Sequence, residues 1–505
     1  MKLLNRIFLV ISVVVLLSGC SAAQHRNQMN LFNSAYATGD YDSALSAVGF
    51  DITEGQPIDS EAHLLNLLHQ GELYRLSGRY QESTQAFDLA EEGMKYLDNT
   101  GVIGSAAENL LAIMVNDSER DYQALMSEAV LVNTYKGLAF LAAGNNEYAR
   151  IEFNRADDRT RRAVEYFQNE IAQQQAALEK EAEDKESNAF LVNDNLNSAS
   201  LHEAVAQNYE TPSGWSVLPE FIVPSSTYLH GIYFIANAAG SSDYERAATS
   251  LKRVADMNNA SAVLQADAKL ASALASGRQN PGKLEPQVWV VYENGLGPVL
   301  EETRFEVPLL LFADDEGTSK LTYYGIALPK YAERPAVPGS IGVVGDSGEA
   351  IQTEHLSDMG TVIRTEMKER FPGVLARAVS SAVVKAVIQN QAADRFGLAG
   401  QLGASVFALA TTQADLRGWQ AMPNHWQAAR VNRPESGVLT LIDHQGDILG
   451  RVNIPQQPFT LVYVKRPTTH GPATVVTMDL QGNRPATLVS LPELQSTPAQ
   501  VSSVH

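Results

Sequence analysis

Ser347 is the residue whose neighbours in the sequence most suggest covalent chemistry. It lies in the run Gly345-Asp346-Ser347-Gly348, a pattern in which a serine hydroxyl can attack a carbonyl carbon once a histidine takes its proton. A catalytic loop of this type continues with glycine, whereas position 349 is glutamate, and no matching histidine motif precedes it in a β-rich context. Gly, Asp and Ser are also the residues that tight turns prefer. We therefore predict that Ser347 is a turn residue and not a nucleophile.

The residue types that bind metals and phosphates are also poorly spaced for those tasks. The ten histidines never occur as HxxxH or at another metal-ligand spacing. The run Asp314-Asp315-Glu316-Gly317 lacks the alternating oxygen ligands of a calcium loop. Gly339, Gly342 and Gly345 form GxxGxxG, which is neither a phosphate-binding loop nor a dinucleotide fingerprint. The sequence thus predicts no catalytic residues, no metal site and no cofactor.

Cys20 is the only cysteine of the chain, and its position predicts that it is modified. Lys2 and Arg6 precede the apolar run Ile7–Leu17, which is typical of a secretory signal and too short to span a bilayer. The ending Leu17-Ser18-Gly19-Cys20 resembles a bacterial lipobox, in which the cysteine thiol is joined to diacylglycerol. The alternative is an ordinary cleaved signal that happens to end at a cysteine. The lipobox reading makes residues 1–20 a lipoprotein signal peptide.

The lipobox resemblance also implies a location. Among lipoproteins, a residue other than aspartate after the cysteine implies export to the outer membrane, and this chain has Ser21 there. We therefore expect a fatty-acylated protein of the outer membrane that faces the periplasm. Residues 21–30 are small and polar, as a tether would be, and ten extended residues reach at most about 35 Å.

Composition limits the remaining possibilities. A chain of 505 residues predicts two or three domains. The net charge is −20, and cleavage of the signal removes Lys2 and Arg6 and leaves −22. Such a surface repels phosphate backbones, so we expect no nucleic acid partner. Lipidation of Cys20 would leave no thiol for a disulfide, so stability must come from packing.

Residues 31–280 have helical periodicity and contain a repeat. Small and aromatic residues recur with a shift of 66, which two copies of a 33-residue unit would produce. The spacing resembles the tetratricopeptide repeat, in which small side chains let two helices approach and an aromatic ring fills the gap between neighbouring pairs. We therefore predict an all-α tetratricopeptide-like solenoid. Its core positions are Gly71, Tyr74, Phe87 and Ala90 in one copy and Gly137, Phe140, Phe153 and Ala156 in the other.

Partial copies flank these two units. Tyr41, Ala44 and Val48 match the second half of a unit, and Gly231 with Leu251 matches a unit that has four extra residues in its turn. The middle unit, near Gly104, keeps only its first half. A polar helix over 155–187 is expected to project from the solenoid, either as a solvated insertion or as a coiled-coil partner site. Residues 187–227 are predicted to be a connecting loop.

Residues 281–492 have a different pattern, which predicts an α+β domain. Short β-branched and aromatic runs separated by Gly, Pro and Asp predict strands. Helices are expected over 357–392 and 396–413 between the two groups of strands. After Pro492 the tail 493–505 lacks core residues and is predicted to be disordered. The predicted strands are 287–293, 305–312, 321–328, 437–442, 448–452, 459–464 and 473–478.

Two segments carry a family resemblance. Tyr292-Glu293-Asn294-Gly295-Leu296-Gly297-Pro298-Val299 and Asp415-Leu416-Arg417-Gly418-Trp419-Gln420-Ala421-Met422-Pro423-Asn424 resemble motifs of an uncharacterised group of Gram-negative outer-membrane lipoproteins. Members of that group have tetratricopeptide-like N-terminal halves, and the resemblance brings no catalytic residues. We call these segments motif 1 and motif 2.

Two classes of function remain. The first is a non-enzymatic scaffold that holds periplasmic or membrane proteins during assembly or maintenance of the cell envelope. The alternative is an envelope enzyme, or a carrier of a small molecule or lipid, with its site in the C-terminal α+β domain. A carrier should retain a cargo that mass spectrometry of the purified protein detects, and a scaffold should not.

Overall fold

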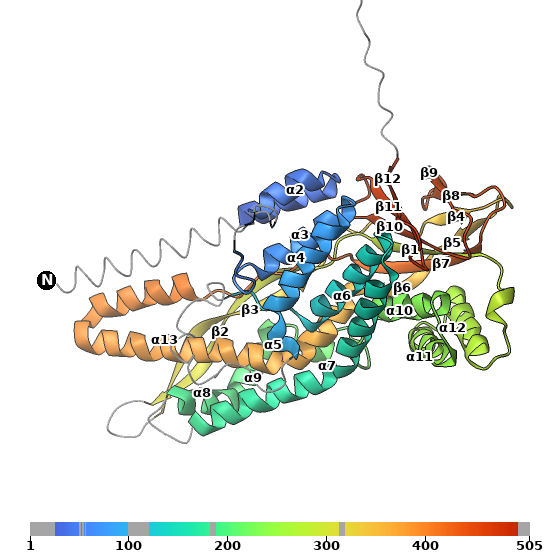
Figure 1. Cartoon of the computed structure of the whole chain (residues 1–505). Coiled ribbons are helices and arrows are strands. Elements are labelled where there is room, and N and C mark those ends of the chain that lie inside the picture. The colour runs from blue at the N-terminus through green and yellow to red at the C-terminus, as the bar shows by residue number, and fades with distance from the viewer. Residues whose placement is uncertain are drawn as a thin grey trace, which may run out of the picture.

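The structure is a computed structural model that describes residues 26–49, 52, 55, 57–98, 121–181, 188–312 and 319–492. The predicted signal peptide with Cys20, the middle unit near Gly104 and the predicted tail 493–505 lie outside the described residues. Within these ranges an N-terminal helical region is followed by a C-terminal region of mixed sheets and helices, as predicted (Figure 1).

Helices form the described part of the chain up to residue 280. A helix over 26–37 buries Met29, Phe32 and Tyr36, which lie on one face because their spacing follows the helical repeat. The helical region therefore includes residues 26–30, which the sequence analysis assigned to the tether. The other helices are α2 (Tyr41–Val48), α3 (Leu64–Leu76), α4 (Tyr80–Gly93), α5 (Lys95–Asp98), α6 (Met126–Ala142), α7 (Asn146–Glu181), α8 (Asn188–Leu196), α9 (Ala199–Asn208), α10 (Pro224–Ala236), α11 (Ser241–Met257) and α12 (Ala262–Ala275).

Three helix pairs, α3–α4, α6–α7 and α10–α11, have the same type of close contact. A Cβ atom on Gly71 would lie 2.5 Å from the ring of Phe87, and one on Gly137 would lie 2.9 Å from the ring of Phe153. In the third pair a Cβ on Gly231 would lie 2.5 Å from Leu251. Each glycine thus permits a separation between helices that any larger residue would prevent.

The long polar segment differs from its prediction. Helix α7 runs without a break from Asn146 to Glu181, so the second helix of a pair and the projecting segment are one element. Residues 188–208 form α8 and α9 and not a loop. The apolar runs in these helices are too short to show periodicity alone. Side chains such as Val192, Leu201 and Val205 stabilise the helices because they pack in one core with residues of the distant strands β2 and β3.

Twelve strands form three sheets in the described part of the chain. A six-stranded sheet has the order β12-β11-β10-β1-β7-β6, with β1 and β10 parallel and the other neighbours antiparallel. A four-stranded sheet has the order β5-β4-β8-β9, and β2 and β3 form a long hairpin. The strands are β1 (Gln287–Asn294), β2 (Val299–Phe312), β3 (Ser319–Ala332), β4 (Gly342–Val344), β5 (Ala350–Gln352), β6 (Glu354–Asp358), β7 (His425–Asn432), β8 (Val438–Ile442), β9 (Ile448–Asn453), β10 (Phe459–Arg466), β11 (Ala473–Asp479) and β12 (Thr487–Leu491).

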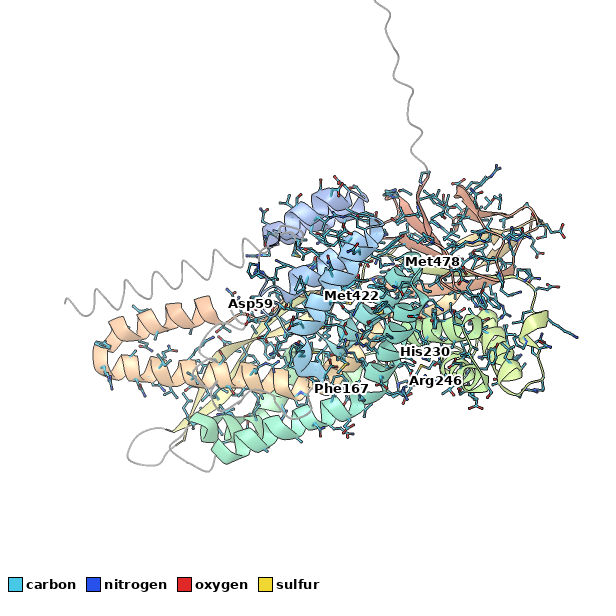
Figure 2. All side chains as sticks on the ribbon, in the orientation of Figure 1. Asp59, Phe167, His230, Arg246, Met422 and Met478 are labelled. Carbon is cyan, nitrogen blue, oxygen red and sulfur yellow. The ribbon has the colours of Figure 1, made fainter. Side chains whose placement is uncertain are left out.

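The six-stranded sheet lies between the helical region and the four-stranded sheet. Trp289 and Val291 of β1 pack into the core that the helix pairs form, whereas Val290 and Tyr292 pack against the four-stranded sheet. The central strand is therefore buried on both faces, which explains its continuous apolar run. Met422 and Met478 belong to the core shared with the helices, and Figure 2 labels both of them. The helical region and the sheet thus share one core.

A second part of the C-terminal region, which we call the arm, extends to the left in Figure 1. It consists of the β2–β3 hairpin, α8, α9 and α13 (Met359–Thr411), which share a core of their own. Helix α13 turns back at Gly397, where φ is +59°. Its first part, Met359–Ala393, is long and apolar enough to cross a membrane, but half of its most apolar stretch is buried within the protein. Burial against the hairpin already accounts for that composition.

Candidate binding pocket between the helical and C-terminal regions

Motif 1 and motif 2 lie side by side, although more than a hundred residues separate them in the chain. The backbone N–H of Gly297 donates to the carbonyl oxygen of Met422 at 2.8 Å, and that of Asn424 donates to Asn294 at 3.0 Å. A Cβ atom on Gly297 would lie 2.9 Å from the carbonyl oxygen of Pro423. The glycine of motif 1 is therefore required by the approach of motif 2.

Arg334 holds the two motifs together from one side. Its guanidinium donates to the carbonyl oxygens of Gly297 and Gln420, the second at 2.7 Å. Burial lowers the pKa of Arg334 to about 10. Carbonyl oxygens satisfy this buried cation through hydrogen bonds, so its role is to fix two loops.

A buried cluster of charges joins these motifs to helix α3. The ammonium of Lys465 lies 2.9 Å from a carboxylate oxygen of Glu72 and 2.6 Å from one of Glu293. Arg75 pairs with Glu72 at 2.8 Å and lies over the rings of Tyr135 and Tyr463. The cluster contains two anions and two cations, so its charges balance. Burial alone would raise the pKa of Glu72, but Arg75 and Lys465 hold it below its ordinary value.

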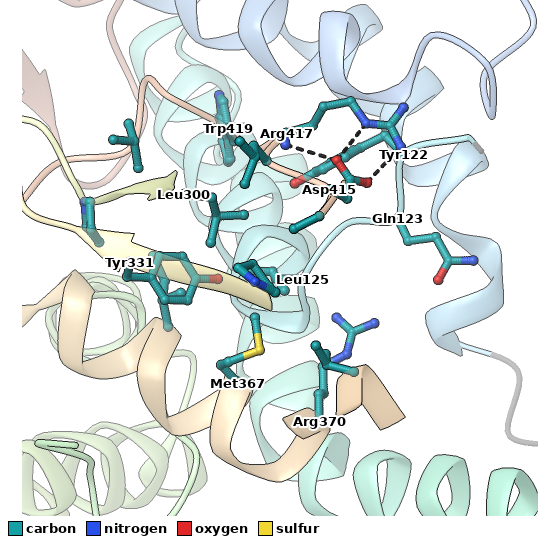
Figure 3. A pocket seen from close by; sticks show the side chains of 18 of the residues that line it. Tyr122, Gln123, Leu125, Leu300, Tyr331, Met367, Arg370, Asp415, Arg417 and Trp419 are labelled. Carbon is teal, nitrogen blue, oxygen red and sulfur yellow. Dashed lines mark hydrogen bonds and ion pairs between the residues drawn. The ribbon is translucent and has the colours of Figure 1, made fainter. Parts of the chain in front are cut away.

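Beyond the motifs lies a cavity of about 200 Å³ (Figure 3). One side is formed by the segment that leads into α6, and the opposite side by the bases of β2 and β3 together with α13. Residues 412–422, which include most of motif 2, close a third side. The apolar wall includes Leu125, Leu300, Ile363, Met367, Val374 and Trp419, and the polar groups include Tyr122, Tyr331, Arg370, Asp415 and Arg417.

Two buried carboxylates bind the N-terminus of α6 beside this cavity. Glu128 accepts hydrogen bonds from the hydroxyl of Tyr122 at 2.7 Å and from the backbone N–H groups of Leu125 and Trp419. Glu366 of α13 accepts from the N–H of Met126 at 2.6 Å. Exposed N–H groups at a helix start attract negative charge, which explains the placement of both acids.

Burial raises the pKa of both acids, although the hydrogen bonds that they accept act to lower it. The pKa of Glu128 rises to about 7 because desolvation outweighs the donors from Leu125, Tyr122 and Trp419. The pKa of Glu366 is also raised, again chiefly by desolvation, although nearby Arg370 opposes the shift. Each acid thus gains a proton more readily than a solvated carboxyl does.

The polar groups of the pocket are arranged in pairs. Arg417 binds Asp415 at 2.7 Å, and Arg370 lies 3.5 Å from Glu366. Figure 3 shows the side chains of Asp415 and Arg417 at one end of the cavity and those of Tyr331 and Met367 at the other. An apolar interior with a charged edge is suited to bind an apolar or aromatic group whose polar end stays near the edge. Among the described residues no three His, Cys, Asp or Glu side chains lie together as metal ligands would.

Most of the predicted repeat positions are core residues. Tyr74, Phe87, Ala90, Phe153 and Ala156 are buried. The ring of Phe87 lies 6.0 Å from Trp419 of motif 2, so the helix pair directly supports that loop.

Two other predicted positions lie on or near the surface. Phe140 is only partly buried and stacks on the exposed Tyr148 at 5.2 Å, because it faces the edge of its helix pair. Ser347 is exposed in a turn, and its hydroxyl accepts from the N–H of Glu349 at 3.3 Å. That placement agrees with the turn role predicted from its sequence.

Sequence reasoning missed the buried charges. Glu293 and Lys465 each lie near the end of an apolar run, and the parallel pairing of β1 with β10 puts them directly opposite each other. A lone charge in a strand buried on both faces is a signal that a partner of opposite sign exists. The partner could not be identified without the strand register.

Comparison of this chain with protein-family models, with curated proteins and with solved structures finds no match. Function is therefore inferred from the geometry and chemistry of the pocket and its surroundings.

Proposed function

We propose that this chain is a non-enzymatic outer-membrane lipoprotein that acts as a protein-interaction scaffold in envelope assembly or maintenance. In this proposal Cys20 carries the lipid, the folded part faces the periplasm, and the helix pairs are tetratricopeptide-like units. The motif resemblance and the repeated Gly71–Phe87 type of contact support it. Its partners are periplasmic or membrane proteins.

The size of the pocket is the observation that carries this proposal. Small-molecule sites usually measure about 300–1,000 Å³, whereas this cavity is about 200 Å³. A cavity of this size suits one or two side chains, and protein interfaces often depend on an apolar or aromatic anchor that fills such a pocket. The cavity is lined by residues of the helical region and of the C-terminal region, and a pocket that is present in the chain without a partner lowers the cost of ordering on binding.

The helix pairs leave little of their own surface for a partner, so the proposed contact is at the pocket. Nearly every residue of α3, α6 and α10 is buried, because these helices pack against neighbouring helices and the chain's own sheet. The inner face that repeat proteins often use for peptides is therefore occupied. The net charge of −20 further favours partners that present a basic patch, through electrostatic steering.

Photocrosslinking in cells tests the scaffold role. A benzophenone amino acid at Gln123, which is exposed on the wall of the pocket, is expected to give a discrete crosslinked protein. The matched control places the same group at Ile448, which is 64% exposed on β9. Equal crosslinking at both positions, or none at Gln123, would contradict the proposal. A deletion strain should also become more sensitive to detergents or cell-wall antibiotics.

The second candidate is a carrier of a small molecule, which the apolar wall of the same cavity favours. Native mass spectrometry of the purified protein would then show a retained mass, and Met367→Trp should abolish it by filling the cavity. If the purified protein retains a small molecule and no protein is crosslinked at Gln123, the carrier hypothesis should replace the scaffold hypothesis.

The anchor is tested separately from the partner. Cys20→Ala is expected to leave an unprocessed precursor that takes up no labelled fatty acid, because the lipid is joined to that thiol. Equal labelling of the variant and the wild type would show that the anchor assignment is wrong.

A further inference from the structure

The turn of α13 at Gly397 exposes three large apolar side chains within seven residues. Phe396 is 46% exposed, Leu398 is 71% exposed and Leu402 is 59% exposed. Exposed apolar residues normally occur singly on a protein surface, and a cluster indicates an interaction site. We call Phe396, Leu398 and Leu402 the tip.

The tip lies at the far end of a helical hairpin. The amide of Gln389 donates to the hydroxyl of Ser405 at 2.8 Å, and the ammonium of Lys385 donates to Thr412 at 3.1 Å. These bonds hold the segment after Gly397 against the segment before it. Figure 1 shows this turn at the end of the arm, away from the six-stranded and four-stranded sheets. The hairpin thus presents the tip at a distance from the body of the protein.

A second element of the arm has a similar surface. Leu321 and Tyr323 on the outer face of β3 are exposed, and they lie close to the end of the β2–β3 hairpin. Figure 1 shows that hairpin extending to the same side of the molecule as the turn of α13. Apolar exposure is therefore a property of the arm and not of a single residue.

The dimensions of the tip favour a lipid surface over a protein. A stable protein interface buries about 800 Å² on each partner and involves roughly 20–30 residues on each side. Three side chains on a convex turn are too few for that, whereas apolar side chains of a helix can be buried about 5–10 Å into the boundary between headgroups and acyl chains without a complementary protein surface. A second copy of the chain would need a much larger complementary face.

Charge decides which lipid surface is suitable. The net charge is −20, so anionic headgroups repel the protein as a whole. Arg395 is exposed beside the tip, but a single arginine carries too little positive charge to offset that repulsion. A zwitterionic surface avoids this cost while it accepts the apolar side chains.

We propose that the tip inserts into the headgroup layer of a zwitterionic bilayer and gives the protein a second, non-covalent attachment to the membrane. This inference rests on the proposed anchoring at Cys20, because six residues from Cys20 to Arg26 span at most about 21 Å and keep the folded part near the bilayer. Local tethering raises the effective concentration of a weak second contact.

Vesicle binding tests the tip without the lipid anchor. The mature chain with Cys20→Ser is mixed with phosphatidylcholine–phosphatidylethanolamine vesicles and sedimented. The triple variant Phe396→Ser/Leu398→Ser/Leu402→Ser is expected to bind at least tenfold more weakly than its parent. Ile448→Ser, which removes an equally exposed apolar side chain from β9, is the matched control and should bind as the parent does.

Three outcomes would overturn the inference: no binding by the parent, equal binding by the triple variant, or loss in that variant of a dimer seen by size-exclusion chromatography. Phe396→Trp provides a fluorescence measurement of insertion that does not require removal of the apolar side chains of the tip. Its fluorescence should shift to shorter wavelength on vesicles and be quenched by brominated lipid. The Cys20→Ser chain used for vesicle binding carries no lipid. A negative vesicle result therefore leaves the fatty-acid labelling and photocrosslinking results unaffected, and negative results in those two experiments leave vesicle binding measurable.

Discussion

At the scale of single residues, the contacts between glycines and aromatic rings determine how closely the helix pairs pack. Phe87 and Phe153 occupy equivalent positions, and each ring lies where a Cβ on Gly71 or Gly137 would be. Both rings are buried, so replacing either leaves a cavity that rigid neighbouring helices cannot close.

We predict that Phe87→Ala and Phe153→Ala each reduce the free energy of unfolding by about 3–5 kcal/mol, the usual cost of truncating a buried phenylalanine. Phe140→Ala is the control. Because Phe140 is partly exposed, this variant should reduce the free energy of unfolding much less than the two core variants do. Chemical denaturation measures all three. An unchanged midpoint for both core variants would show that the equivalence of these positions is wrong.

At the scale of elements, α6 begins between two carboxylates whose pKa values are raised. The folded protein keeps a proton on Glu128 up to about pH 7, whereas an unfolded glutamate releases it near its ordinary value of 4.5. Between those values the folded state binds more protons, so stability falls as pH rises and levels off above pH 7.

We predict that the wild type is less stable at pH 8 than at pH 5, with Glu128 contributing about 3 kcal/mol at most. Glu128→Gln should remove much of that difference, because the amide does not titrate. Urea unfolding at the two pH values measures the effect, and Glu245→Gln on the exposed surface of α11 is the control. The same pH dependence in Glu128→Gln and in wild type would assign the effect to other groups.

At the scale of the whole molecule, one shared core and one buried charge cluster join the helical region to the sheet. Lys465 connects helix α3, strand β1 and motif 2, since it contacts Glu72, Glu293 and the carbonyl oxygen of Ala421. A buried pair adds little stability relative to apolar residues, but a buried charge without its partner is costly.

We predict that Lys465→Met reduces the free energy of unfolding by about 3–5 kcal/mol, because it leaves the buried Glu293 without its cation. The double variant Lys465→Met/Glu293→Gln should recover a substantial part of that loss. Equilibrium unfolding in urea tests this with a double-mutant cycle. If the two single losses simply add in the double variant, the pair is not coupled as the structure indicates.

Local sequence patterns are sufficient to predict the elements whose residues alternate or repeat regularly. The runs that became β1, β8, β9, β10 and β11 were identified within a few residues, because β-branched stretches between turn residues carry their own signal. Strands β4–β7 and β12 were missed. Strand β7 contains Gln427, Arg430 and Asn432, and only its position beside β1 makes it a strand.

The sequence by itself determined the succession of a helical region and a region of mixed sheets, the equivalence of Gly71–Phe87 with Gly137–Phe153, and the turn at Ser347. These depend on spacing along the chain, which the sequence contains directly. The tertiary structure alone decided that motif 1 and motif 2 meet, that Glu293 pairs with Lys465, and that a cavity lies between the two regions. Those features depend on the register and packing of segments far apart in the chain, and a single sequence does not specify which of its distant segments become neighbours.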